Sequence, residues 1–151
     1  MEIESGKIGR RMTTKTLINK KIVSSLMKKW SNRLWLNEWH LYMKPSDKPI
    51  VENDSELFPV IARCNTINNY KKATITIDSK LWANMGEVER RRTIIHELVH
   101  VVNSQIEEYI FELLEELPSQ KRNAYEKWFV NVREQTAEHW TNVLGGAYKD
   151  E

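Results

Sequence analysis

The feature that most constrains the fold is a stretch of regularly spaced apolar residues between residues 87 and 117, which contains no proline and no glycine. Its large apolar side chains recur at three- and four-residue spacing, which is the repeat of one face of an α-helix. Because globular helices are usually shorter, we allow for a kink at Asn103 and Ser104. Pro118 ends this stretch, since proline disfavours helical backbone in the residue before it. The sequence therefore predicts one long helix.

A second long helix is expected directly after Pro118. Ser119 is the predicted N-cap, and Gly145 and Gly146 are expected to end the helix. The residues that recur at helical spacing here are Tyr125, Trp128, Phe129, Val132, Thr136, Trp140 and Leu144. We therefore expect this stripe to face the core.

The first half of the chain predicts one helix and a small sheet. Residues between Leu17 and Trp30 have helical apolar spacing, with Thr13 or Thr14 as the cap. We expect strands at residues 35–43, 58–64 and 73–77, a loop at 44–49, a turn at 65–69 and a short helix at 80–85. The predicted fold class is α+β, with an N-terminal helix, a three-stranded sheet and two long helices after it.

Composition narrows the possible function classes. Cys64 is the single cysteine, which excludes an internal disulfide and a zinc site built on several thiolates. No stretch of about 18 apolar residues occurs, so we expect no membrane span. The start of the sequence has no apolar leader segment, which favours a cytoplasmic protein.

The formal net charge of +2 is unevenly distributed along the chain. Residues 1–29 contain eight lysines and arginines against Glu2 and Glu4, whereas residues 101–120 contain five glutamates and no lysine or arginine. We expect residues 1–13 to form a flexible basic arm and residues 14–147 to form a single domain. Nucleic-acid contact through the arm is the less favoured interpretation, because lysines commonly cover the solvent face of an amphipathic helix.

Two histidines and a glutamate lie within the long helix, in the order His96-Glu97-Leu98-Val99-His100. Positions four residues apart share a helical face, so His96 and His100 can offer ring nitrogens to one ion. Glu97 lies about 100° around the helix, within reach of a metal-bound water. Two histidine ligands with an intervening glutamate base form the zinc pattern H-E-x-x-H. The alternative is a pair of helix histidines held by backbone or carboxylate groups without a metal.

A catalytic zinc ion needs a third protein ligand. His40, His139 and the glutamates of the last helix are candidates. Glu134 and Glu138 lie four residues apart, so Glu134 can bind the metal while Glu138 accepts a hydrogen bond from the outward nitrogen of a ligand histidine. The alternative is an ordinary solvated pair of carboxylates. We therefore expect one Zn²⁺, bound by the two histidines of the motif and Glu134.

These motifs resemble those of small gluzincin-type metallopeptidases, most nearly the bacterial, prophage and phage proteins related to the ImmA/IrrE type. Members share a helix, a small sheet whose last strand precedes the H-E-x-x-H helix, and then an E-x-x-A motif. Here residues 73–77 match that strand, and Glu134-Gln135-Thr136-Ala137 matches the second motif. The resemblance covers residues 30–145, although those proteins usually carry asparagine where this chain has Glu138. It implies a minimal zincin fold.

The resemblance also implies a zinc-dependent peptidase that acts on a protein or peptide. In this mechanism Glu97 takes a proton from the attacking water and passes it to the leaving amine. His139 and Tyr109 are candidate donors to the carbonyl oxygen, with core packing or capping as the alternative for each. The substrate is expected to add as an extra strand to Ala73, Thr74, Ile75, Thr76 and Ile77.

Two other functions stay open. The first is a zincin scaffold that acts as a phage or prophage regulatory module, binding a host factor without proteolysis, and the basic arm favours it. The second is a helical interaction protein without a metal. Bound zinc, together with activity that disappears in Glu97→Ala while the metal is retained, is expected only for the peptidase.

Overall fold

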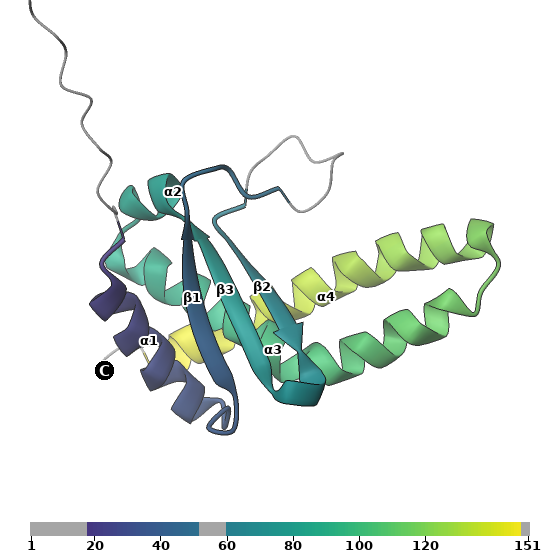
Figure 1. Ribbon diagram of the computed structural model, residues 1–151, viewed down its shortest axis with the longest axis horizontal. Helices are drawn as coiled ribbons and strands as arrows, with labels where there is room; N and C mark the ends of the chain where they lie inside the picture. The colour runs from purple at the N-terminus through teal and green to yellow at the C-terminus, as the bar shows by residue number, and fades with distance from the viewer. Residues whose placement is uncertain (1–17, 52–59, 149–151) are drawn as a thin grey trace, which may run out of the picture.

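The computed structural model describes residues 18–51 and 60–148, which form four α-helices and a three-stranded sheet (Figure 1). The elements are α1 (Lys20–Arg33), β1 (His40–Ser46), β2 (Ala62–Ile67), the 3-10 turn η1 (Asn68–Tyr70), β3 (Lys72–Asp78), α2 (Ser79–Ala83), α3 (Glu87–Glu115) and α4 (Ser119–Ala147). The fold class is α+β, as the sequence predicted. The predicted basic arm at residues 1–13 lies outside the described residues.

The sheet has the strand order β1-β3-β2, with β1 parallel and β2 antiparallel to β3. Ala73, Ile75 and Ile77 of β3 are fully buried, while Thr74 and Thr76 point to the opposite face. In Figure 1 the long helices lie behind the sheet, and no helix of the described residues covers its front face. Because β3 is paired on both sides, the expected addition of a peptide strand to residues 73–77 is wrong.

The limits of β1 and β2 differ from the predicted ones. Residues 44–46 continue β1, although prolines predicted a loop there. Proline has no backbone N–H to donate to a neighbouring strand. Pro45 is tolerated because β1 is an edge strand, which pairs with β3 on one side only. Residues 65–67 belong to β2 rather than to a turn, and the chain reverses afterwards, at η1 and Lys71, whose φ is 44°. The first residues of the predicted 58–64 strand, 58 and 59, lie outside the described residues.

The helices also begin and end differently from the prediction. Asn19 caps α1, its side chain accepting a hydrogen bond from the Lys21 N–H, while the expected caps Thr13 and Thr14 lie outside the described residues. Residues 35–39, predicted as strand, precede β1, and Trp35 there has a φ of 60°. The first helical residue of α4 is Ser119, because Pro118 occupies the cap position.

The two long helices, α3 and α4, form a hairpin that rests on the sheet at one end and projects past it at the other (Figure 1). α3 is uninterrupted at Asn103 and Ser104, and α4 continues through Gly145 and Gly146. On the sheet side, α3 is held by the buried side chains of Ile94, Ile95, Leu98 and Val99. The apolar core therefore lies between the sheet and the inner half of α3.

The side of α4 that faces the core differs from the predicted stripe. Phe129 is buried as expected, but Trp128 is 63% and Trp140 48% exposed. The small residues Ala137 and Thr141 are buried instead, because small side chains allow α4 to approach α3 closely.

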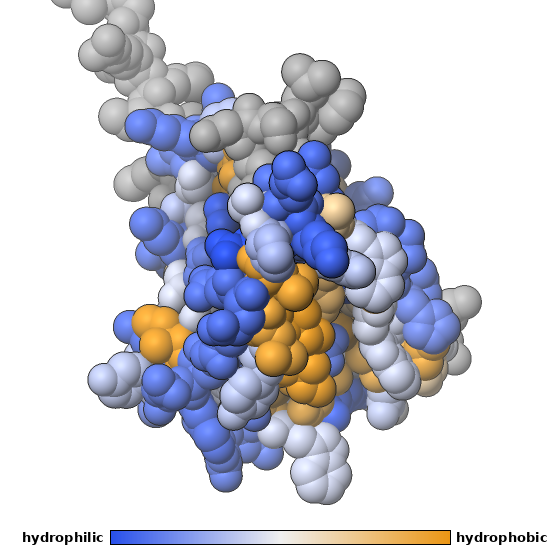
Figure 2. Space-filling model, turned by 90° about the vertical axis from the view of Figure 1, so that its right-hand side faces the viewer, coloured by the Kyte–Doolittle hydropathy of each residue, from blue (hydrophilic) through white to orange (hydrophobic). Residues whose placement is uncertain are grey.

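Exposed apolar residues on the hairpin include Val102, Ile106, Tyr109, Leu113 and Tyr125. Figure 2, which faces the projecting end, shows an apolar patch there. No helix in the described ranges is long and apolar enough to cross a membrane.

Candidate metal centre

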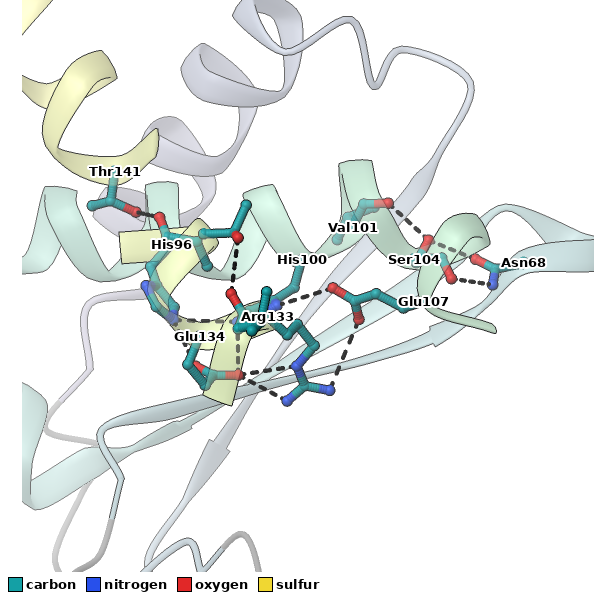
Figure 3. Close-up of polar contacts among 12 residues, drawn as sticks. Asn68, His96, His100, Val101, Ser104, Glu107, Arg133, Glu134 and Thr141 are labelled. Carbon is teal, nitrogen blue, oxygen red and sulfur yellow. Dashed lines mark hydrogen bonds and ion pairs between the residues drawn. The ribbon is translucent and has the colours of Figure 1, made fainter. Parts of the chain in front are cut away.

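Three predicted ligand side chains meet where α3 and α4 cross the sheet (Figure 3). His96 Nε2 lies 3.2 Å from His100 Nε2 and 3.3 Å from Glu134 Oε2. His100 Nε2 lies 3.5 Å from Glu134 Oε1. The structure thus brings together two histidines from one helix and a carboxylate from the next, 34 residues further along the chain.

These separations fit a tetrahedral zinc ion. With bonds of about 2.0–2.1 Å to nitrogen and oxygen, neighbouring ligand atoms of a tetrahedron lie about 3.3–3.4 Å apart. Two separations agree with that edge length, 3.2 Å between the two Nε2 atoms and 3.3 Å between His96 Nε2 and Glu134 Oε2, while His100 Nε2 lies 3.5 Å from the other carboxylate oxygen, Oε1. A set of two imidazoles and one carboxylate leaves the fourth position open, as in catalytic zinc sites. The same donors also accept other first-row divalent ions.

The local sequence explains this convergence. Leu98 and Val99 are buried against the core, which turns the neighbouring positions His96 and His100 toward α4. On α4, Ala137 has no exposed surface, so the helix approaches α3 at this level. Glu134 lies one turn before Ala137 and reaches the histidines from there.

Each ligand histidine has a carboxylate near its second ring nitrogen. Glu138 Oε2 lies 3.7 Å from His96 Nδ1, in the place that the sequence predicted for it. Glu107 Oε1 lies 3.6 Å from His100 Nδ1. Such partners orient a ligand imidazole and make it a better donor. Glu107 was missed by the sequence reasoning, although its position seven residues after His100, two turns along the same face, was a usable signal.

Arg133 contacts two carboxylates of the site, those of Glu134 and Glu107. Its Nε and Nη2 donate to Glu134 Oε1 over 3.0 and 2.8 Å, and its Nη1 lies 3.8 Å from Glu107 Oε2. One oxygen of Glu134 is therefore held by the guanidinium, while Oε2 stays directed at His96. Arg133 was also missed, because nothing in the sequence distinguishes it from a solvated arginine.

The charges of the site shift its protonation equilibria. Burial disfavours the charged imidazole of His100, but the carboxylates of Glu107 and Glu134 outweigh it and raise its pKa to about 9. Burial opposes the charged form of Glu134 too, yet the two histidines and Arg133 hold the pKa of that carboxyl far below its usual range. The site therefore favours an anionic Glu134 opposite a positive charge, whether that charge is a proton on imidazole or a metal ion.

The triad opens into a cleft of about 930 Å³ between β2, α3 and α4. Glu97, 6% exposed, also lines this cleft, and so does Cys64 of β2. At one end, Ser104 Oγ donates to Asn68 Oδ1 over 2.6 Å, which ties the turn after β2 to α3. The cleft therefore has one wall made by a strand and one made by the helix pair.

Three of the sequence-predicted candidates do not reach this cleft. His40 lies on β1, which β3 separates from β2, so it is not a ligand of this site. His139 is exposed and packs its ring against Trp140. Tyr109 is 67% exposed on the outer half of α3. His139 and Tyr109 do not line the cleft, so neither is placed to donate to a substrate there.

Comparisons of the chain with protein-family models, with curated proteins and with solved structures found no match.

Proposed function

We propose that this protein is a zinc-dependent metallopeptidase with a minimal zincin fold. The observation that supports the proposal most is the spacing of His96, His100 and Glu134, which suits a tetrahedral ion with one open position. The resemblance of the H-E-x-x-H and E-x-x-A motifs to those of ImmA/IrrE-type proteins supports it independently of the geometry.

A zinc ion, when bound by this triad, supplies Lewis-acid chemistry by polarising a carbonyl and lowering the pKa of water to about 7. Glu97 acts as the general base, because it follows a ligand histidine on α3 and lines the same cleft. Its carboxylate takes the proton of the attacking water and delivers it to the leaving amine. Glu107 and Glu138 keep the two imidazoles oriented.

We propose further that a peptide substrate pairs with β2 rather than with β3. β2 lines the cleft, and in the described part of the chain no strand pairs with its outer edge. An extended peptide can therefore add to this edge by main-chain hydrogen bonds, which places it beside the triad. The unpaired edge of β1 lies at the far side of the sheet from the cleft.

Metal content tests the ligand assignment. We expect purified wild-type protein to contain one zinc per chain, and His96→Ala and Glu134→Ala to lose it, as measured by elemental mass spectrometry. His139→Ala is the matched control. It removes an exposed histidine that lies outside the cleft, on α4, the helix that also carries Glu134. If zinc content is unchanged in both ligand variants, the site is wrongly assigned.

Peptide cleavage tests the reaction. Wild-type protein is incubated with a peptide library derived from a whole proteome, and new amino termini are identified by mass spectrometry. We expect cleavage by the wild type and none by Glu97→Gln, with the zinc content of that variant unchanged. Zinc bound at one equivalent without cleavage would instead support a regulatory module that uses the zincin scaffold for binding.

A further inference from the structure

The sheet face opposite α3 and α4 carries exposed cations at several of its described positions. The strand register aligns nine outward positions in three rows, which are His40–Lys72–Ile67, Tyr42–Thr74–Asn65 and Lys44–Thr76–Arg63. The next pair of this parity, Ser46 and Asp78, ends the strands, and Asp78 is buried there as the cap of α2. None of the nine is acidic, although the chain as a whole has 21 acidic residues against 23 lysines and arginines. This face lies on the opposite side of the sheet from α3 and α4 (Figure 1), although Arg63 and Asn65, on the edge strand β2, also line the cleft of the candidate metal centre.

Protection of the sheet edges accounts for only part of this charge. Charged side chains on edge strands prevent pairing with other chains, which explains Lys44 on β1 and Arg63 on β2. Lys72 lies on the central strand, where no edge needs protection. Neighbouring strands are about 4.8 Å apart and successive rows about 6.7 Å apart, so Lys44 and Arg63 share one row about 10 Å apart, and Lys72 lies two rows, about 13 Å, away. Cations separated in this way suit a ligand that carries several anionic groups.

A groove of about 440 Å³ between α1 and β1 extends the same surface. Lys20 and Lys28 of α1 line it, together with Tyr42 and the partly buried Trp39. Tyr42 belongs to both the groove and the outer face, is 50% exposed, and has the Lys72 ammonium 5.0 Å from its ring centroid. Exposed aromatic rings beside cations are the combination that binds single-stranded nucleic acid, with bases stacked on rings and phosphates held by cations.

We propose that this face and the adjoining groove bind single-stranded nucleic acid. The phosphates contact Lys44, Arg63 and Lys72, and an unpaired base stacks on Tyr42. A duplex is not the expected ligand, because its bases are stacked on one another and no helix projects from this flat face to enter a groove. Lys44, Lys72 and Tyr42 lie outside the cleft of the proposed peptidase, and only Arg63 lines both surfaces.

Binding of fluorescein-labelled oligo-dT and oligo-U to the full chain, followed by fluorescence anisotropy, tests the proposal. We expect saturable binding. The logarithm of the association constant should fall linearly with the logarithm of the salt concentration, with a slope of about −2 for three phosphate contacts on a single strand. The triple variant Lys44→Glu, Arg63→Glu, Lys72→Glu should weaken binding at least tenfold. The control reverses the same number of charges at exposed positions elsewhere, with Lys80→Glu, Lys121→Glu and Lys127→Glu.

A second variant tests the stacking contact without changing the charge. Tyr42→Ala should weaken binding at least fivefold, as the loss of one stacked base predicts, whereas Tyr109→Ala on the distant hairpin should not. The proposal is overturned if no saturable binding occurs below about 100 µM, or if the control charge reversals weaken binding as much. It is also overturned if poly-glutamate of equal charge competes as well as the oligonucleotide, since the face would then be a site for acidic proteins.

Discussion

The Nδ1 atom of His100 lies 3.6 Å from Oε1 of Glu107, a carboxylate two turns further along the same helix. Both atoms are buried and have no hydrogen-bond partner among the described residues. A ligand imidazole usually donates its second N–H to such a carboxylate, and the pair tightens when the other nitrogen binds a metal. We therefore expect Glu107 to raise the affinity of the proposed site for a metal ion.

Replacing Glu107 by glutamine should weaken zinc binding by roughly 10–100-fold, the usual cost of losing a partner of a ligand histidine. The affinity is measured by competition with a chromophoric chelator. Glu112→Gln serves as the control, because it makes the same change on an exposed position of α3 and should leave the affinity unaltered. Equal affinities for Glu107→Gln and the wild type would show that Glu107 does not act through His100.

The metal-free protein should be most stable in mildly acidic solution. The folded-state pKa of His100 is raised from 6.5 to about 9, so its contribution is complete below about pH 6.5 and is lost as the pH rises through 9. The pKa of Glu134 is lowered from 4.5, so its contribution is present above that pH and is lost in acid. Melting temperatures of chelator-treated protein should therefore peak between about pH 4.5 and 6.5.

The control for this pH dependence is His100→Gln, which removes the titrating imidazole. The melting temperature of the wild type should decline between about pH 6.5 and 9, and that of His100→Gln should not. A wild-type profile that rises steadily through this range would contradict the arrangement of charges around His100.

Truncation of Leu98 should destabilise the fold strongly. Leu98 has no exposed surface and lies in the core between α3 and the sheet, so Leu98→Ala removes buried contacts and leaves a cavity. The expected loss in the free energy of unfolding is about 2–5 kcal/mol, measured by urea denaturation. Leu113→Ala, the same change at a 69% exposed position of the same helix, should cost at most about 0.5 kcal/mol. Similar losses at both sites would contradict the burial pattern of α3.

The thiol of Cys64 should react slowly in the folded protein, although it lines the cleft. Burial raises its pKa above the usual range, and the nearby carboxylates of Glu97 and Glu107 add to this shift. Because the thiolate is the reactive form, labelling by a chromogenic disulfide reagent at pH 8 should be much faster in denaturant than in buffer. Equal rates in the two conditions would place the thiol in contact with solvent.

Local patterns were sufficient to predict that His96 and His100 lie together. His96 and His100 share a helix, and helical spacing alone places them on one face. Glu134 belongs to another helix, so its proximity depended on how α3 and α4 pack, which the resemblance of the motifs suggested and the structure shows. Glu107 satisfied the same helical spacing, but seven glutamates of α3 look alike in the sequence until their surroundings are known.

The errors came from features that depend on the whole fold. Pro45 was assigned to a loop, because the sequence does not reveal that its strand lies at the edge of the sheet, where proline is tolerated. Trp128 and Trp140 were placed in the core on hydrophobicity, whereas the inward face of α4 is taken by Ala137 and by the site residue Glu134. A helix face that carries polar functional groups cannot be recognised from apolar periodicity.

The hairpin of α3 and α4 carries the His96, His100 and Glu134 triad at its supported end. There Leu98, Val99 and Val101 are buried, whereas Ile106 and Leu113 near the projecting end are exposed. Amide protons exchange with solvent through local opening, and opening costs least where few side chains are buried. Exchange along α3 should therefore be fast at the tip and slow near the histidines, so that the outer turns can fray while the ligand geometry persists.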